Sequence, residues 1–382
     1  MLIYIIFIAT IFLVSSNRYA SLRLRNGTVI ALSFFFIGLR YETGFDWPTY
    51  KAQYAYISET GISSFFELLG TQSLVGTVEP GYVLTTFLAS RLFSEFEFVA
   101  AFYTLVLLLS IVKLGSVLGV RNIGMALVLI HMPLLFTLEF STVRQSLAIA
   151  MFNFGLAYFF EKRRGLSILF FSLSPFFQLS GIIYLAVFAM AIVSKRTSWA
   201  IFIGLTAVLI TISTPTILLT FGSFLPPQIV TKLEWYLIER NQGGGIIDLG
   251  TALILLLPAT LLTVNAMRKH GQSRDTATIL QVVALMSFIA LVFVSEQTIR
   301  NRLVYEIVIL LSLLAFSRIY LILPYMRMVL LLYGLIILSI YLVQESRIMY
   351  LPYQNYVGWT AFGIESSGQD RAIEYNARLR SR

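Results

Sequence analysis

Long apolar stretches separated by short polar ones dominate the chain. A helix that crosses a bilayer satisfies its own backbone hydrogen bonds and needs about 20 apolar residues. The pattern therefore predicts an all-α protein whose residues 1–382 form a single integral membrane domain, a polytopic bundle of transmembrane helices. The predicted crossings are 1–15, 27–40, 97–118, 122–139, 141–161, 198–221, 246–267, 276–295, 302–321 and 325–344.

Two apolar segments do not fit a single plain crossing. Residues 165–193 are too long for one helix, and Pro175 lies there among serines and a glycine that favour a break. We therefore expect two short helices, 165–174 and 176–193, which brings the total to about 12 crossings. Residues 81–94 are too short to span, and we expect them to form a helix on or in the outer face.

The basic residues predict the orientation of this bundle. With the N-terminus outside, the inner loops and adjoining helix ends hold more than half of the lysines and arginines, but only Glu161 and Asp275 among the carboxylates. This asymmetry follows the positive-inside rule. The long outer segments are then 41–96, 222–245 and 345–382, which are periplasmic in a bacterial inner membrane. The inner basic residues are Arg18, Arg23, Arg25, Lys113, Arg121, Lys162, Arg163, Arg164, Lys195, Arg196, Arg268, Lys269, Arg274, Arg318 and Arg327.

Composition supports the membrane prediction and argues against several other classes. The chain is 58% hydrophobic and 12% charged, whereas soluble domains are nearer half apolar and a quarter charged. It contains no cysteine, so disulfides and thiolate metal sites are excluded. Motifs typical of nucleotide-binding loops or metalloproteases are also missing. We therefore expect no metal, no cofactor and no nucleic-acid partner.

The first cluster of candidate site residues follows the second apolar stretch. Asp46 and Pro48 fit a helix N-terminus, and Tyr50 would share a face with Asp46. Arg40 lies at the outer end of the preceding helix. The alternative is an interfacial anchor, in which Arg40 snorkels while Trp47 and Tyr50 belong to an aromatic belt.

The second cluster lies at the start of the apolar helix predicted at 141–161. Arg144 and Gln145 are on its first turn, and Ser141 or Thr142 can cap it. A guanidinium beside a helix N-terminus suits a phosphate or diphosphate. The alternative is a snorkelling Arg144 paired with Glu139.

The third cluster contains Arg300 and Arg302, which begin another helix on the outer side. Two arginines there suit a diphosphate, but local pairs of Arg300 with Glu296 and of Arg302 with Glu306 are equally consistent with the spacing. Arginines from three separate segments thus gather on the outer side. That distribution favours an anionic lipid headgroup over an ion path through the membrane.

Four further polar residues complete the candidates. Glu79 precedes Pro-Gly on the outer side, where it is either a general base toward a sugar hydroxyl or an ordinary loop acid. Gln178 lies at the break in 165–193 and can hydrogen-bond a substrate. His131 lies within a helix and is expected to be packed and hydrogen-bonded, whereas His270 is expected to be solvated in an inner loop.

These motifs resemble the EpsG-like branch of the Wzy polysaccharide polymerases. The family pattern of an arginine, Gly-x-Asp and a tyrosine four residues later matches Arg40, Gly44, Asp46 and Tyr50. Its Arg-Gln pair matches Arg144 and Gln145. The family often has histidine in an FHxS element, but this chain has Gln178 there, which cannot act as a base. The similar stretches are GLRYETGFDWPTY (38–50), EPGYVLTTFLA (79–89), STVRQSLAIAMFNFGLAYFFEKRRG (141–165), SPFFQLSGIIYL (174–185) and LPYQNY (351–356).

The resemblance implies a fold similar to the GT-C class of membrane glycosyltransferases and an undecaprenyl-diphosphate-linked oligosaccharide as substrate. The enzyme would transfer the growing glycan from one lipid carrier to a sugar hydroxyl of another, facing the periplasm, beside a flippase and a chain-length regulator. Arg144, Arg300 and Arg302 would bind the diphosphate. Arg40 would assist or pair with Asp46, and Asp46 or Glu79 would orient or deprotonate the acceptor. The alternatives are an O-antigen ligase, a lipid-linked oligosaccharide flippase or transporter, and a non-catalytic scaffold.

Overall fold

The computed structural model describes residues 2–60, 79–193, 274–292, 297–317, 324–358, 363 and 367–380. Regular structure in these residues is helical, apart from isolated bridges between Arg40 and Asn355 and between Val120 and Ser317. The crossings predicted at 198–221 and 246–267, the outer segment 222–245 and His270 lie outside the described residues.

The chain divides into two compact units, which are described separately. The first consists of Met1–Gly181 with Ser312–Arg382, and the second of Ile182–Leu311. The helices of the first unit are α1 (Leu2–Ser16), α2 (Leu22–Ser33), α3 (Trp47–Glu59), α5 (Pro80–Ser90), α6 (Phe96–Val117), α7 (Ile123–Leu134), α8 (Val143–Phe160), α9 (Arg164–Phe177), α17 (Pro324–Val343) and α19 (Gly368–Arg380), with π-helical turns η1 (Phe34–Gly38) and η2 (Leu135–Glu139) and the 3-10 helix η5 (Glu345–Tyr350). The second unit contains nearly all of α10 (Gly181–Val193), α15 (Arg274–Val292) and most of α16 (Gln297–Phe316).

Most predicted helices are present, with shifted ends. The helix predicted at 27–40 begins earlier, at Leu22, because Ser21 caps it: the Ser21 hydroxyl accepts a hydrogen bond from Leu24 N at 3.3 Å. The helix predicted at 81–94 is α5, and Asp46 precedes α3 as its N-cap residue, as the sequence predicted.

The break predicted at Pro175 is wrong in position. α9 continues through Pro175, and the chain turns only after it, so that α10 begins at Gly181. Proline here removes one helical hydrogen bond in the last turn of α9, and the preceding Ser174 hydroxyl donates to Ala148 O of α8 at 2.9 Å. The corner itself requires glycine, because a Cβ on Gly181 would lie 2.6 Å from Pro175 N.

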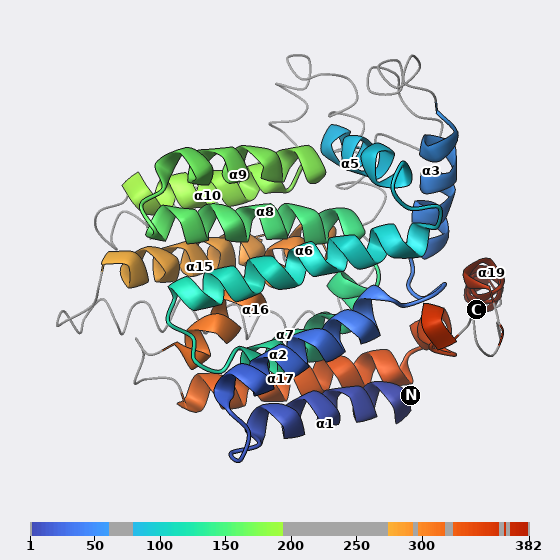
Figure 1. Cartoon of the computed structure of the whole chain (residues 1–382), viewed down its shortest axis with the longest axis horizontal. Coiled ribbons are helices and arrows are strands. Elements are labelled where there is room, and N and C mark those ends of the chain that lie inside the picture. Colours follow the sequence, from blue (N-terminus) through green and yellow to red (C-terminus); the bar gives the residue numbers. More distant parts are fainter. Residues whose placement is uncertain are drawn as a thin grey trace. The chain divides into compact units, whose positions relative to one another are not determined.

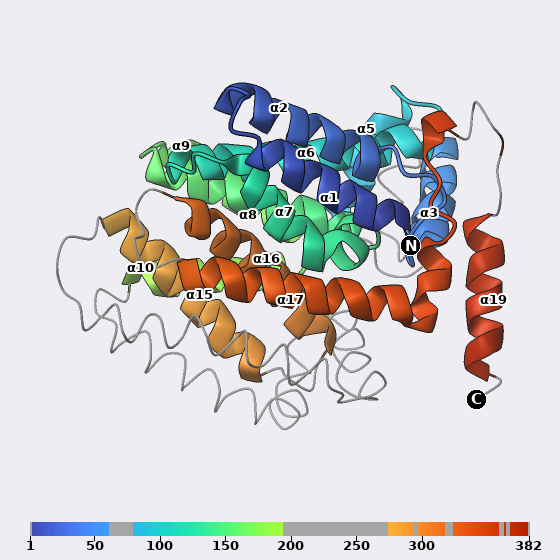
Figure 2. The ribbon, with the colours of Figure 1, turned by 90° about the horizontal axis from the view of Figure 1, so that it is seen from below.

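α8 is the central helix of the first unit. It lies between α6 and α9 (Figure 1), and most of its residues are buried. Gly155 allows α9 to approach closely, since a Cβ there would meet the Phe171 ring at 2.4 Å. On another side of the same unit, α7 packs against α1, α2 and α17 (Figure 2).

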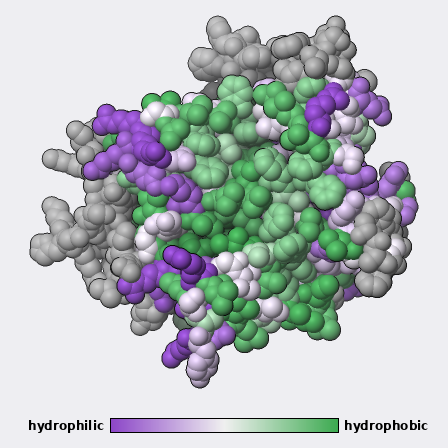
Figure 3. Space-filling model, viewed as in Figure 1, coloured by the Kyte–Doolittle hydropathy of each residue, from purple (hydrophilic) through white to green (hydrophobic). Residues whose placement is uncertain are grey.

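One described helix, α6, is both long enough and apolar enough to cross a membrane by itself. The shorter apolar helices are Leu2–Ser16, Ile123–Glu139, Arg164–Phe177, Gly181–Ile192, Thr278–Ala290 and Arg327–Val343. Large apolar side chains remain exposed on these helices, among them Leu2 and Leu13 of α1, at 70% and 66% exposure, and Ile168 of α9, at 67%. Hydrophobic residues cover much of the face shown in Figure 3. Exposed apolar area of this extent is typical of contact with lipid or protein.

One end of the first unit is joined by a short antiparallel contact between distant segments. After η1, Tyr41 N donates to Gln354 O at 2.9 Å, and Tyr356 N donates to Leu39 O at 2.7 Å. This contact holds the residues before α3 against those that follow η5. α19 also packs on η5 and α3 at this end (Figures 1 and 2).

Gly44 lies where the chain after η1 passes closest to Phe140. Its φ is +121°, and a Cβ would lie 2.2 Å from Phe140 O. We predict that Gly44→Ala lowers the free energy of unfolding by at least about 2 kcal/mol, because the side chain adds both strain and a clash. Thermal unfolding of the detergent-solubilised protein measures the change.

The matched control is Gly27→Ala in α2, where a Cβ would meet nothing within 4 Å. Alanine there should be neutral or stabilise the protein by up to about 1 kcal/mol, since it favours the helix. Equal effects of the two substitutions would contradict a requirement for glycine at position 44.

Candidate functional site

An ion pair joins two of the predicted site residues from distant parts of the chain. Arg144, on the first turn of α8, donates from Nη1 to Glu79 Oε2 at 2.6 Å. Glu79 is the N-cap residue of α5. The Arg144 side chain is 23% exposed and that of Glu79 7%. The alternative pairing of Arg144 with Glu139 is therefore wrong.

Two tyrosines cover the Arg144 guanidinium. Its central carbon lies 5.7 Å from the ring centre of Tyr50 in α3 and 5.9 Å from that of Tyr82 in α5. Both distances are within the range of cation–π attraction. Burial raises the pKa of Tyr50, against the opposing effect of the Arg144 charge. The phenol therefore remains neutral, as a hydrogen-bonding group at the edge of the guanidinium.

Arg40 is stabilised differently and does not pair with Asp46. Its side chain is buried, and Nη1 donates to Ile37 O at 2.7 Å. The guanidinium carbon lies 5.1 Å from the Trp47 ring centre and 5.6 Å from that of Phe140. Asp46 instead serves α3 through its backbone, since its carbonyl accepts from the backbone N–H four residues later at 2.9 Å.

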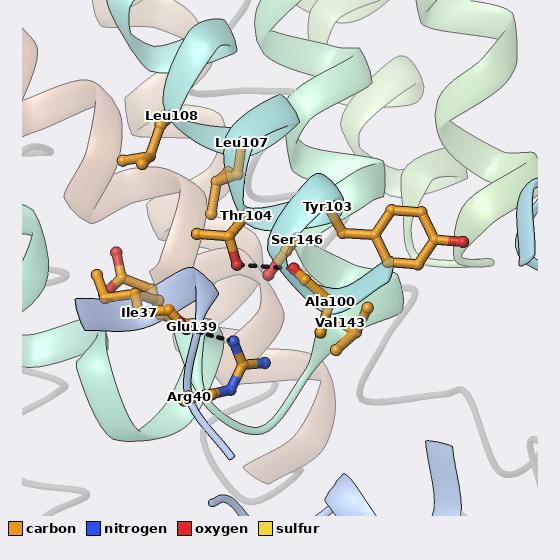
Figure 4. A pocket seen from close by; sticks show the side chains of 10 residues that line it. All are labelled: Ile37, Arg40, Ala100, Tyr103, Thr104, Leu107, Leu108, Glu139, Val143 and Ser146. Carbon is orange, nitrogen blue, oxygen red and sulfur yellow. Dashed lines mark hydrogen bonds between the residues drawn. The ribbon is translucent and has the colours of Figure 1, made fainter. Parts of the chain in front are cut away.

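Arg40 lines a small pocket between η1, α6, η2 and α8. The other polar groups around it are Tyr103, Thr104, Glu139 and Ser146 (Figure 4). In this view, the Arg40 guanidinium and the hydroxyls of Thr104 and Ser146 lie toward the middle, whereas the Tyr103 phenol and the Glu139 carboxyl group point away from it on opposite sides. The pocket thus combines a cation with hydroxyl groups, and Glu139 lies at its edge.

His131 is buried and hydrogen-bonded at both ring nitrogens, as the sequence predicted. Nδ1 lies 2.6 Å from Glu139 Oε1, and Nε2 lies 2.9 Å from Ser33 Oγ. A neutral imidazole with its proton on Nδ1 satisfies both contacts, because Nδ1–H then donates to the carboxylate and the serine hydroxyl donates to Nε2. His131 therefore holds Glu139 in place at the rim of the Arg40 pocket.

The two predicted glutamines lie near the turn between α9 and α10. Gln145 Oε1 accepts from Ser180 Oγ at 2.8 Å. Gln178 is the C-cap residue of α9, and its carbonyl accepts from Gly181 N at 2.8 Å. Both side chains are buried. The hydrogen bond between Ser180 and Gln145 therefore joins this turn to the first turn of α8, beside Arg144.

Arg300 and Arg302 belong to the second unit. Arg300 is buried, and the Arg302 carbonyl accepts from the Tyr184 hydroxyl of α10 at 2.7 Å. Glu306 is completely buried, and its carboxyl oxygens have no hydrogen-bond partner among the described residues. The local pair of Arg302 with Glu306 is therefore wrong, and Glu296 lies outside the described residues. That these arginines join Arg144 at one site remains a prediction.

The structure adds residues for which no functional role was predicted. Tyr82 follows Glu79 in a quoted motif but had no assigned role, and the pairing of Glu139 with His131 was not predicted. One signal was available: two ionisable residues eight apart on an otherwise apolar segment lie near the same helix face. Among the residues that the structure covers, no group of His, Asp or Glu is arranged to hold a metal ion.

We predict that Glu79 and Arg144 are strongly coupled in a double-mutant cycle. With Glu79→Gln, Arg144→Gln and the double variant, the coupling free energy of unfolding should be about 1–3 kcal/mol, because the pair is largely shielded from water. The exposed pair of Arg378 with Glu374 is the control and should give about 0.3–0.5 kcal/mol. Similar couplings for the two pairs would show that the Glu79–Arg144 contact does not bear on stability.

Comparison with known proteins supports a family assignment. A sequence profile of the EpsG family matches residues 27–355, a range that includes every site residue described above. No curated protein and no solved structure matches the chain.

Proposed function

The chain belongs to the EpsG family, whose members are associated with exopolysaccharide synthesis, and we propose that it is the polymerase of such a pathway. In this proposal it joins oligosaccharide repeat units carried on undecaprenyl diphosphate, at the periplasmic face of a bacterial inner membrane. The observation that carries the proposal is the position of Arg144. A guanidinium at the start of α8 is held by Glu79 and two tyrosines from two other helices.

A lipid diphosphate is the ligand that this arrangement suits best. The planar guanidinium can donate to two phosphate oxygens at once, and the first turn of α8 adds the positive end of a helix dipole. Glu79 keeps Arg144 in place before the ligand arrives, and the phosphate can then compete for the same N–H groups. Arg300 and Arg302 would contribute further positive charge at the same headgroup.

The proposed reaction is a glycosyl transfer between two lipid-linked substrates. A hydroxyl of the acceptor sugar attacks the anomeric carbon of the donor, and the bond from that carbon to the diphosphate breaks. The diphosphate leaves with the electron pair, so arginines that stabilise its negative charge lower the barrier. Alignment of the two substrates supplies a further large part of the rate. A carboxylate must also take the acceptor proton, and Asp46 and Glu79 are the candidates given by the sequence.

The membrane setting is also part of the proposal. Charge asymmetry along the sequence supports a multi-pass bundle of about 12 helices with Arg40 and Arg144 at the outer side. The exposed apolar side chains of α1 and α9 support contact with lipid. A flippase would supply the outward-facing substrate, and a chain-length regulator would act on the product.

We predict that Arg144→Ala abolishes polymer ladders on a glycan gel while single-repeat product remains. The substitution removes the diphosphate contact and leaves Glu79 without this partner, so elongation should fall by at least about 100-fold. Arg378→Ala, which removes an exposed arginine of α19, should leave the ladder unchanged at equal expression. Normal ladders with Arg144→Ala would refute the role of this residue.

Purified protein tests the reaction itself. The wild-type chain, given only lipid-linked repeat isolated from cells that lack this gene, should elongate it. A ligase requires a different acceptor and would leave the repeat unchanged, and a flippase would move it without forming a new glycosidic bond. Absence of elongation by active, folded protein would therefore reject the polymerase proposal.

The absence of cysteine allows a direct test of orientation. We predict that Arg378→Cys in α19 reacts with a membrane-impermeant maleimide in intact spheroplasts. Lys162→Cys, at the turn between α8 and α9, should react only after the membrane is permeabilised. The reverse labelling pattern would place Arg144 on the cytoplasmic side and exclude a periplasmic reaction.

A further inference from the structure

The C-terminal helix α19 is anchored to the first unit through a buried arginine and a backbone N–H group. We propose that α19 is a clamp that positions α3 for substrate binding, with Arg371 as the positioning residue. Through the segment before α3, the clamp fixes the direction of Tyr50, whose ring lies near the Arg144 guanidinium. The proposal rests on the polymerase function and adds to it a determinant of diphosphate affinity.

Arg371 is a buried cation that joins α19 to two segments far from each other in sequence. Its Nη1 donates to Pro352 O at 2.9 Å, and its Nη2 donates to Glu42 O. The residue is 3% exposed, and it and Gly368 are the buried ones among the α19 residues whose exposure is described. Burial of a guanidinium is costly unless hydrogen bonds replace its hydration, so the two carbonyls form a specific anchor.

Glu42 is held from three sides in a backbone conformation that is unfavourable by itself. Its φ is +53°, in the left-handed region that residues other than glycine rarely occupy. Such a conformation persists where its surroundings determine it. Arg371 holds the Glu42 carbonyl, while Gly368 N donates to Oε2 at 2.8 Å. Lys51 Nζ donates to Oε1 at 2.5 Å. The carboxylate thus caps the N-terminus of α19, where the helix dipole favours a negative charge, and binds α3 with its other oxygen.

The contact between Glu42 and Lys51 restricts the rotation of α3 about its own axis. Lys51 follows Tyr50 directly in sequence, and successive residues of an α-helix point about 100° apart. With Lys51 bound to Glu42, Tyr50 is directed toward Arg144, whose guanidinium carbon lies 5.7 Å from the ring centre. A displaced Tyr50 would leave Arg144 less well positioned for a diphosphate.

Ring contacts hold the same segment from two sides. Phe45 lies edge-on to Tyr375 of α19, with ring centres 5.3 Å apart, and edge-on to Tyr350 of η5 at 5.6 Å. α19 adds little aliphatic burial to these contacts, since Ile373 is 61% exposed. Loss of the clamp should therefore loosen the segment before α3 without unfolding the helix bundle.

The clamp lies outside the part of the chain that the family profile covers. The match ends at residue 355, whereas α19 begins at Gly368. The residues on which the clamp acts, Glu42 and Tyr50, lie inside the match. Family membership therefore does not account for Arg371, and the inference depends on the contacts of this residue.

The test separates the positioning of Tyr50 from a general loss of structure. The protein is the full chain in lipid nanodiscs, and the probe is the lipid-linked repeat isolated from cells that lack this gene. Affinity for the probe, elongation rate and thermal unfolding are measured for each variant. Arg371→Ala should weaken affinity about tenfold. Arg371→Lys should restore part of the affinity, because an ammonium group can still donate to a carbonyl.

Combination with Tyr50→Ala shows whether Arg371 acts through Tyr50. Tyr50→Ala by itself should weaken affinity at least as much as Arg371→Ala. Effects of distant residues ordinarily add, so an independent role would again cost about tenfold in the Tyr50→Ala protein. If the clamp positions Tyr50, Arg371→Ala should weaken affinity less than about twofold in that protein. Arg378→Ala, on the exposed side of the same helix, is the matched control and should leave affinity unchanged.

A second variant serves if Arg371→Ala does not fold. In Gly368→Ala, the added Cβ would lie 2.8 Å from Glu42 Oε2, which displaces this carboxylate while Arg371 remains. It should give the same loss of affinity, the same dependence on Tyr50, and faster hydrogen exchange in the first turn of α3. Unchanged affinity in either folded variant, or losses that add to that of Tyr50→Ala, would overturn the clamp. Failure of the wild type to elongate the repeat would instead reject the polymerase function.

Discussion

A guanidinium buried at the end of an apolar helix bundle needs compensation, and the first unit provides it in two ways. Arg144 is paired with a carboxylate that lies 65 residues away in sequence, and two tyrosine rings lie within cation–π distance of its guanidinium. Arg40 has rings and a backbone carbonyl instead. The first solution stabilises a charge that stays partly open to solvent, and the second leaves Arg40 Nε without a hydrogen-bond partner among the described residues.

These contacts determine how the segments outside the long helices are held. α3 and α5 are short, and contacts with distant segments add to their packing. The Arg144–Glu79 pair joins α5 to α8, and the Tyr50 ring brings α3 to the same guanidinium. The contact of Tyr41 with Gln354 adds the segment that follows α17. One buried charge thus orders several segments that are distant in sequence.

Periodicity and hydropathy predicted the helices well, because helix formation in apolar segments depends on local backbone hydrogen bonding. They did not predict which charges pair. Local spacing suggested the ion pairs Arg302–Glu306 and Arg144–Glu139. Arg144 instead pairs with Glu79 of another helix, and the buried Glu306 carboxyl group has no hydrogen-bond partner among the described residues. Pro175 was a misleading break signal, because α9 continues beyond it and ends at Phe177.

The π-turns explain why the pocket beside Arg40 could not be predicted from the sequence. A regular α-helix would carry Arg40 and Glu139 to other angular positions, and no residue pattern here marks the extra residue in each turn. The two carboxylates that result have different partners: Glu79 contacts a cation, and Glu139 contacts an imidazole. Neither pairing was predicted, because Arg144 reaches Glu79 from another helix and η2 lies between His131 and Glu139.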